Sequence, residues 1–207
     1  MTNILPPRLS WDHIRDEAEK FRQEYVRPPD KIPVPIIEIA EIDLNIRINP
    51  QPGLRHRSDV EAFLESDLRT LCIDQDLYED PRQEKRLRFT FAHEIGHLIL
   101  HRIEISQIQF AGIEEWVDFR IKMKEEDNRW FESQAYEFAG RLLVPRNQLI
   151  DKIKEKSDGI QKYRDIADDE EALKDAISKL ICDDFFVSAA VIYRRINAEK
   201  IWDELSM

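Results

Sequence analysis

The sequence predicts an α+β fold in which a small sheet precedes a largely helical second half. Eight of the ten prolines lie within the first 52 residues, and the chain holds only five glycines. The part after Arg82 is therefore nearly free of residues that break helices. Short segments with strand character occur between residues 44 and 73, ahead of that part. Strands followed by a run of helices are typical of α+β proteins.

The first half of the chain combines one clear helix with several candidate strands. Ser10 is a suitable N-cap for a helix over Trp11–Tyr25, which Pro28 and Pro29 would end. The remaining elements of this half are a short helix over 35–40, strands over 44–48, 60–64 and 68–73, and a turn over 49–53.

A well-marked helix begins the second half. Asp80 is a good N-cap, Pro81 suits the first helical position, and Gln83 can close a capping box. This helix should run to about His101. Further helices are predicted over 127–144, 147–156, 169–181 and 188–197.

Composition indicates a soluble protein with a core of its own. The chain has 207 residues, of which 42% are hydrophobic and 35% charged, and no apolar run approaches the roughly 18 residues of a membrane span. Residues 1–8 lack the apolar stretch of a secretory signal, and Cys72 and Cys182 form no disulfide framework or CxxC site. We therefore expect a cytoplasmic protein without membrane contact. A net charge of −11 disfavours nucleic acid and favours a basic partner.

The segment His93-Glu94-Ile95-Gly96-His97 is an HExxH motif inside the predicted helix. Four residues on a helix turn through about 400°, so both imidazoles point the same way and can bind one zinc ion. Glu94 is placed to take a proton from a water molecule that zinc activates. The opposite face of the helix is apolar, which indicates that the helix is largely buried.

A catalytic zinc needs a third protein ligand and an open position. Glu132, on the helix predicted over 127–144, shares its face with the small residues Ala135 and Ala139, which would let this helix approach the first one closely. Glu137 is the rival ligand, but it projects about 140° away from Glu132. His101 lies one further turn along the first helix, where support of the site or plain packing is favoured over binding of the ion.

Two stretches resemble the signature of ImmA/IrrE-type metallo-endopeptidases. They are Arg88-Phe89-Thr90-Phe91-Ala92-His93-Glu94-Ile95-Gly96-His97-Leu98-Ile99-Leu100-His101 and Glu132-Ser133-Gln134-Ala135-Tyr136-Glu137-Phe138-Ala139-Gly140-Arg141-Leu142-Leu143-Val144-Pro145. A later stretch over 185–196 is similar to the tail of the family, and the resemblance covers about residues 30–197. It implies that His93, His97 and Glu132 bind Zn²⁺ and that Glu94 is the general base.

The resemblance also implies an architecture and a substrate. The fold would be a small gluzincin-like metalloprotease domain over 31–157, with a short sheet and active-site helices. A helical N-terminal extension over 1–30 would precede it. A helical C-terminal region over 158–207, resembling a helix-turn-helix unit, would pack on it. Members of this family are typically intracellular proteases that cut DNA-binding repressors, so the partner would be a helix-turn-helix repressor.

The sequence thus predicts a zinc-dependent endopeptidase acting on a specific intracellular regulatory protein. One alternative is a regulatory or interaction protein with a non-catalytic metal, although such a site needs no base between its histidines. Another is a zinc hydrolase acting on a non-peptide bond. His56, Tyr78 and Tyr136 are the candidate donors to the oxyanion, and the strand over 68–73 is expected to lie along the cleft. Residues 114–127 are either a solvated helix or loop, or a lid.

Overall fold

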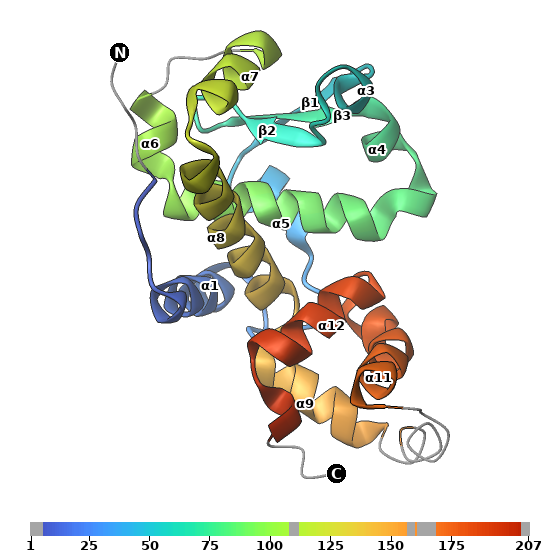
Figure 1. The fold of residues 1–207 in the computed structure, drawn as a ribbon. Helices are drawn as coiled ribbons and strands as arrows, with labels where there is room; N and C mark the ends of the chain where they lie inside the picture. Colours follow the sequence, from blue (N-terminus) through green and yellow to red (C-terminus); the bar gives the residue numbers. More distant parts are fainter. Residues whose placement is uncertain (1–5, 108–111, 157–159, 161–168, 204–207) are drawn as a thin grey trace.

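The computed structural model of this chain describes residues 6–107, 112–156, 160 and 169–203. Figure 1 shows a small sheet on one side of a set of helices, which confirms the α+β class. In chain order the elements of the first half are α1 (Trp11–Tyr25), α2 (Ile36–Glu38), a π-helical turn (Ile39–Asp43), β1 (Arg47–Gln51), α3 (Leu54–Ser58), β2 (Ala62–Leu64), β3 (Thr70–Asp74), α4 (Gln75–Glu79) and a 3-10 turn (Pro81–Gln83). The second half has α5 (Glu84–Leu100), α6 (Arg102–Gln107), α7 (Ile113–Lys122), α8 (Glu125–Leu143), α9 (Arg146–Glu155), α11 (Glu170–Phe185), α12 (Ala189–Ala198) and a 3-10 turn (Ile201–Asp203).

The sheet has three strands in the order β1-β3-β2. Strand β1 pairs parallel with β3, and β2 pairs antiparallel with it. The strand expected over 68–73 is therefore the central one, and its edges are both occupied. The strand expected to lie along the cleft thus has no open edge for a substrate, and β2 is the edge strand near α5 (Figure 1).

The first strand lies about three residues later than the sequence suggested. Strand β1 covers Arg47–Gln51, so Pro50 belongs to the strand and not to a turn. Proline has no N–H to donate, yet an edge strand needs donors on one side only. The edge position of β1 explains why the strand tolerates Pro50, which the sequence pattern alone indicated as a breaker.

Helix α1 has the predicted bounds, and its cap is the predicted one. The hydroxyl of Ser10 accepts a hydrogen bond from the backbone N–H of His13 at 3.1 Å. From the last turn, the buried guanidinium of Arg22 donates to the carbonyl oxygens of Leu142 (2.8 Å) and Pro29 (2.6 Å). The bond to Leu142 links α1 to the carboxyl end of α8, and the bond to Pro29 links it to the segment that follows α1.

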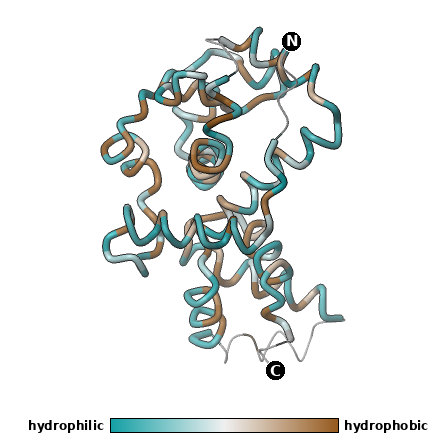
Figure 2. The backbone as a smooth tube through the Cα atoms, turned by 90° about the vertical axis from the view of Figure 1, so that its left-hand side faces the viewer, coloured by the Kyte–Doolittle hydropathy of each residue, from teal (hydrophilic) through white to brown (hydrophobic). Residues whose placement is uncertain are grey.

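Helix α5 lies at the centre of the molecule, and Figure 2 views it almost end-on with other elements around it. Asp80 caps the start of this segment as predicted, by accepting from the N–H of Arg82 at 3.1 Å. The expected capping box does not form, because the N–H of Asp80 bonds instead to the carbonyl of Asp76. The side chain of Gln83 also turns to that carbonyl, at 3.2 Å.

The helices at the carboxyl end pack on α8 through a buried cluster of charges. Glu199 follows α12 and its carboxylate is 1% exposed. Its oxygens lie 2.8 Å from Arg141 of α8 and 3.0 Å from Arg15 of α1, and Arg195 of α12 also contacts it. The boundary predicted between 157 and 158 lies outside the described residues, and the division into three regions stays a prediction.

Several short helices were not predicted, namely α3, α4 and α6. Residues 114–127, for which both a helix and a loop were considered, contain most of α7 and the start of α8. Across the parts of the chain that the structure describes, none of the helices combines the length and apolar character needed to cross a bilayer.

Candidate metal centre

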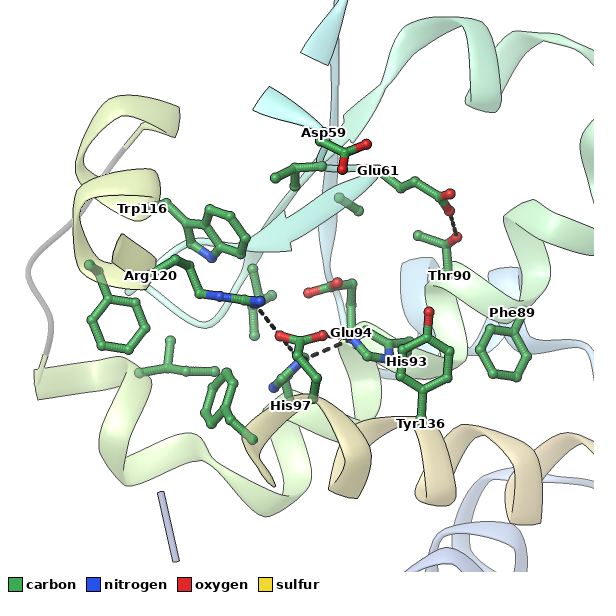
Figure 3. Close-up of a pocket in the computed structure, with 17 residues that line it drawn as sticks. Asp59, Glu61, Phe89, Thr90, His93, Glu94, His97, Trp116, Arg120 and Tyr136 are labelled. Atoms are coloured by element: carbon green, nitrogen blue, oxygen red, sulfur yellow. Dashed lines mark hydrogen bonds and ion pairs between the residues drawn. The ribbon is translucent and has the colours of Figure 1, made fainter. Parts of the chain in front are cut away.

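Two histidines of α5 face each other across one helical turn. The Nε2 atoms of His93 and His97 are 3.1 Å apart, and their rings meet edge to face with centroids separated by 4.7 Å (Figure 3). Their spacing of four residues places both rings on the same side of the helix, as expected from the sequence. The two nitrogen atoms can therefore coordinate the same metal ion.

Glu132 of α8 brings a carboxylate to these imidazoles. Its Oε2 lies 3.2 Å from Nε2 of His93, and its Oε1 lies 3.7 Å from Nε2 of His97. The structure thus brings together the three residues that were expected to bind the metal, with one ligand atom of each within 4.8 Å of the others. Glu137, the rival ligand, contacts Arg141 and Arg195 instead, on another side of α8.

The spacing of the donor atoms of these three residues fits zinc. Tetrahedral ligands about 2.1 Å from zinc lie about 3.4 Å from one another. Nε2 of His93 lies 3.1 Å from Nε2 of His97 and 3.2 Å from Oε2 of Glu132, and the second carboxylate oxygen, Oε1, lies 3.7 Å from Nε2 of His97, so these separations are all close to that value. Two imidazoles and one carboxylate also form a donor set that catalytic zinc sites use, and they leave a fourth position open.

Small residues allow α5 and α8 to approach closely enough for this contact. A Cβ atom added to Gly96 would lie 3.1 Å from the carbonyl oxygen of Ala135 and 3.2 Å from its Cα. Ala135 and Ala139, which the sequence analysis singled out for their size, are both fully buried. The role of Gly96 was missed, although a glycine between the two histidines on the helix side facing α8 could have indicated it.

Charges and burial act in opposite directions on the three candidate ligands. Burial lowers the pKa of His97 well below its usual value. Burial opposes protonation of His93 too, but the contact with Glu132 outweighs it and raises the pKa of His93. Burial would raise the pKa of Glu132, yet the two histidines and Arg120 hold the pKa of this carboxylate well below its usual range.

His101 does not join the three candidate ligands. It is fully buried, stacks on the ring of Phe131, and places its Nδ1 2.9 Å from Nδ1 of His97. Burial lowers its pKa to about 4, so this imidazole is neutral at neutral pH. A neutral His101 can accept the N–H of His97, which leaves the Nε2 lone pair of His97 free to face the ion.

Glu94 stands beside the candidate ligands, and its side chain is buried. It lines a cavity of about 240 Å³ together with His93, His97 and Glu132. Burial, together with the nearby charge of Glu132, raises the pKa of Glu94 to about 7. The structure thus places the expected base at the wall of the cavity that the candidate ligands share.

Arg120 enters this cavity from α7, and no sequence motif predicted its place there. Its guanidinium contacts Oε1 of Glu132 and packs over the ring of Trp116, with 4.9 Å between the guanidinium carbon and the ring centre (Figure 3). Its Nε is buried and has no hydrogen-bond partner within the described residues. Arg120 lies 12 residues before Glu132 and on a different helix, so the spacing of residues along one helix did not indicate this contact.

Of the three candidate oxyanion donors, Tyr136 is the one that lines the cavity. Its ring meets that of His93 edge to face at 4.7 Å between centroids, and the residue is 46% exposed. Neither His56 nor Tyr78 is among the lining residues. Strand β2 and the residues just before it form another wall, so a backbone edge runs beside the candidate ligands.

The fold and this site define a small α+β domain with an HExxH helix and a glutamate from a later helix at one candidate metal centre. A sequence model of the peptidase M78 family, described as the IrrE N-terminal-like domain, matches residues 43–197, and the chain therefore belongs to this family. Membership supports a peptidase function. A comparison with curated proteins gives no significant match.

Proposed function

We propose that the protein is a zinc-dependent endopeptidase that cleaves a specific intracellular regulatory protein. The observation that carries this proposal is the meeting of His93, His97 and Glu132 at a cavity that the buried carboxylate of Glu94 also lines. A metal site that served structure alone would need neither this carboxylate nor an accessible cavity. Family membership supports the same reading.

The chain's own residues divide the chemistry between them. Bound at the three ligands, zinc would polarise a peptide carbonyl and activate a water molecule. Glu94 takes the proton of the attacking water and passes it to the nitrogen of the leaving amine. Tyr136 and Arg120 line the same cavity and supply donors for the oxyanion that develops on the carbonyl.

Strand β2 is suited to hold the substrate in an extended conformation. It pairs with β3 on one side only within the described sheet, and its residues Ala62 and Leu64 line the cavity. An extended peptide that added to this edge would present its backbone to the candidate ligands. The cut should therefore fall in an extended or locally unfolded segment of the substrate.

We propose a DNA-binding repressor of the helix-turn-helix class as the substrate and the cytoplasm as the place of action. The net charge of −11 supports a basic protein partner over direct contact with nucleic acid. Cleavage in a linker or oligomerisation region would separate a repressor dimer from its operator. A narrow specificity follows, because a freely active protease in the cytoplasm would be toxic.

The test is co-expression of the protein with helix-turn-helix proteins encoded by neighbouring genes, followed by mass spectrometry of the fragments. The wild type should cut one of them, and Glu94→Gln should not, although this variant should keep the fold and should bind zinc as tightly as the wild type. Glu155→Gln, on the exposed side of α9, is the matched control. Efficient digestion of casein, or full biological activity of Glu94→Gln, would contradict the proposal.

A further inference from the structure

A large groove leads away from the metal centre between α5, α8 and α12. Its volume is about 960 Å³, four times that of the cavity over the candidate ligands, which is about 240 Å³. The two spaces share Phe89, Glu132 and Tyr136 as lining residues. A peptide that lies at the candidate ligands can therefore continue into the groove along the surface of the protein.

One wall of this groove belongs to the helical C-terminal region. Figure 1 shows α12 lying beside α8. The residues of α12 that line the groove include Ala190, Val191, Arg194 and Ala198. Three of these side chains are small, so they leave room for side chains of a bound segment. The buried residues Ile192 and Ile196 hold the other face of α12 in the core.

The groove is basic, in contrast to the acidic chain as a whole. Its lining includes six cationic side chains and two carboxylates, Glu132 and Glu137. Five of the cations already have a carboxylate partner: Arg82 pairs with Asp80, Lys85 with Asp183, Arg86 with Glu61, Arg129 with Glu125, and Arg195 with Glu137. Arg194, the sixth, has no carboxylate partner within the described residues.

Arg194 is exposed and lies over an aromatic ring that contacts the metal centre. Its guanidinium carbon is 5.9 Å from the centre of the Tyr136 ring. That ring in turn lies 4.7 Å from the ring of His93. An extended peptide advances about 3.3 Å per residue. The two distances together place the guanidinium no more than about three residues of extended chain from the ring of His93.

We infer that the groove holds the part of the substrate that flanks the cleaved bond and that Arg194 selects an acidic side chain there. This inference rests on the proposed endopeptidase function. A guanidinium binds a carboxylate through two parallel hydrogen bonds, and Arg194 lies over the ring of Tyr136 at the edge of the groove. Trp11, Phe89 and Val191 also line the groove and accommodate apolar side chains of the same segment. The recognised segment is thus acidic and apolar, even within a basic partner.

Nucleic acid is the other polymer that a basic groove attracts. It is disfavoured here because five of the six cations are already neutralised by ion pairs within the protein, and because the chain carries a net charge of −11. A single free guanidinium suits one carboxylate of a peptide better than a run of phosphates.

Selection from a random peptide library tests this inference by binding, without turnover. Immobilised Glu94→Gln protein loaded with zinc should enrich peptides with Asp or Glu at one position. Adding Arg194→Glu to this protein should weaken the selected peptides about tenfold and shift the preference to Lys or Arg. Lys154→Glu, exposed on α9 and outside the groove, changes the net charge equally and should leave the preference unchanged.

The outcomes separate this inference from the proposed function. Selected peptides that are cut by the active protein without any charge preference would overturn the inference and leave the endopeptidase intact. Peptides that bind with the Arg194-dependent preference but are never cut would support the recognition and contradict the endopeptidase. A preference that survives Arg194→Glu, or displacement of the peptides by a single-stranded DNA oligonucleotide, would also overturn the inference.

Discussion

Arg120 and Glu132 are in direct contact at the candidate metal centre, although one belongs to α7 and the other to α8. The guanidinium holds Oε1 of the carboxylate, while Oε2 lies 3.2 Å from Nε2 of His93. A carboxylate fixed at one oxygen keeps the other directed at the ion. Partners of this kind outside the ligand set commonly matter for metal affinity.

Replacing Arg120 by Ala should therefore weaken zinc binding about 10- to 100-fold. The measurement is competition for zinc with a chromophoric chelator. Lys122→Ala is the control, because this exposed residue of α7 pairs with Asp118 away from the centre. Tighter binding by Arg120→Ala would show the opposite relationship, in which the guanidinium competes with the ion for Glu132.

The ligand set can be checked by metal content. Wild type should bind one divalent ion per chain, and Glu132→Ala and His97→Ala should each lose most of it, because either change removes one of three donors. Glu137→Ala should retain the ion, since this carboxylate contacts Arg141 and Arg195 instead. Elemental analysis after dialysis measures the metal content of each variant. One metal ion per chain in Glu132→Ala would refute the assignment of Glu132 as a ligand.

Gly96→Ala should loosen the contact between α5 and α8. The added methyl group meets the backbone of Ala135 at 3.1–3.2 Å, and backbone atoms cannot rotate away as a flexible side chain can. We expect a loss of about 1–3 kcal/mol in the free energy of unfolding, together with weaker zinc binding. Gly112→Ala is the control, since its Cβ would meet only the side chain of Glu115. Equal stability of both variants in urea would contradict the close approach.

Glu199→Ala should destabilise the protein by about 3–5 kcal/mol. Removing this carboxylate leaves the two buried guanidinium groups of Arg141 and Arg195 to share the single carboxylate of Glu137. Glu155→Ala removes an exposed ion pair with Lys152 and should change stability by no more than about 0.5 kcal/mol. Urea denaturation measures both, and similar values for the two variants would argue against a buried cluster.

Cys72 should make stability depend on pH in the alkaline range. Burial, and a hydrogen bond to Glu65 at 3.2 Å, raise the pKa of this thiol to about 12. As pH rises, the thiol ionises in the unfolded chain before it ionises in the folded one. The contribution of Cys72 to the free energy of unfolding is therefore complete below pH of about 9 and is lost as pH rises towards 12. In a Cys182→Ala background, the free energy of unfolding should fall more steeply with pH than after a further Cys72→Ala change. The same dependence of the free energy of unfolding on pH in both variants would contradict this prediction.

Local signals predicted the elements that are well capped or strongly periodic. Ser10 predicted the bounds of α1, and the HExxH segment together with Glu132 predicted which side chains meet. These features depend on neighbours along one helix, or on small residues that permit close packing. The spacing of residues along the sequence was therefore enough to predict them.

Long-range pairing could not be predicted in the same way. The order of the strands depends on which edges meet in space, so the central position of β3 and the edge position of β2 were missed. Arg120 was missed for a similar reason, because its partner Glu132 lies on another helix. The distance between Arg120 and Glu132 along the sequence does not indicate that their side chains meet.

The placement of α12 beside the groove separates two kinds of change that the proposed peptidase can undergo: a change of substrate and a change of reaction. This helix supplies a wall to the space where a substrate would lie, yet none of the candidate ligands and no base. Exchanging the side chains that α12 presents to the groove would change the substrate of the proposed peptidase while the reaction itself stayed the same. A set of variants differing only at positions 190, 191, 194 and 198 would thus be a starting library for proteases of new selectivity.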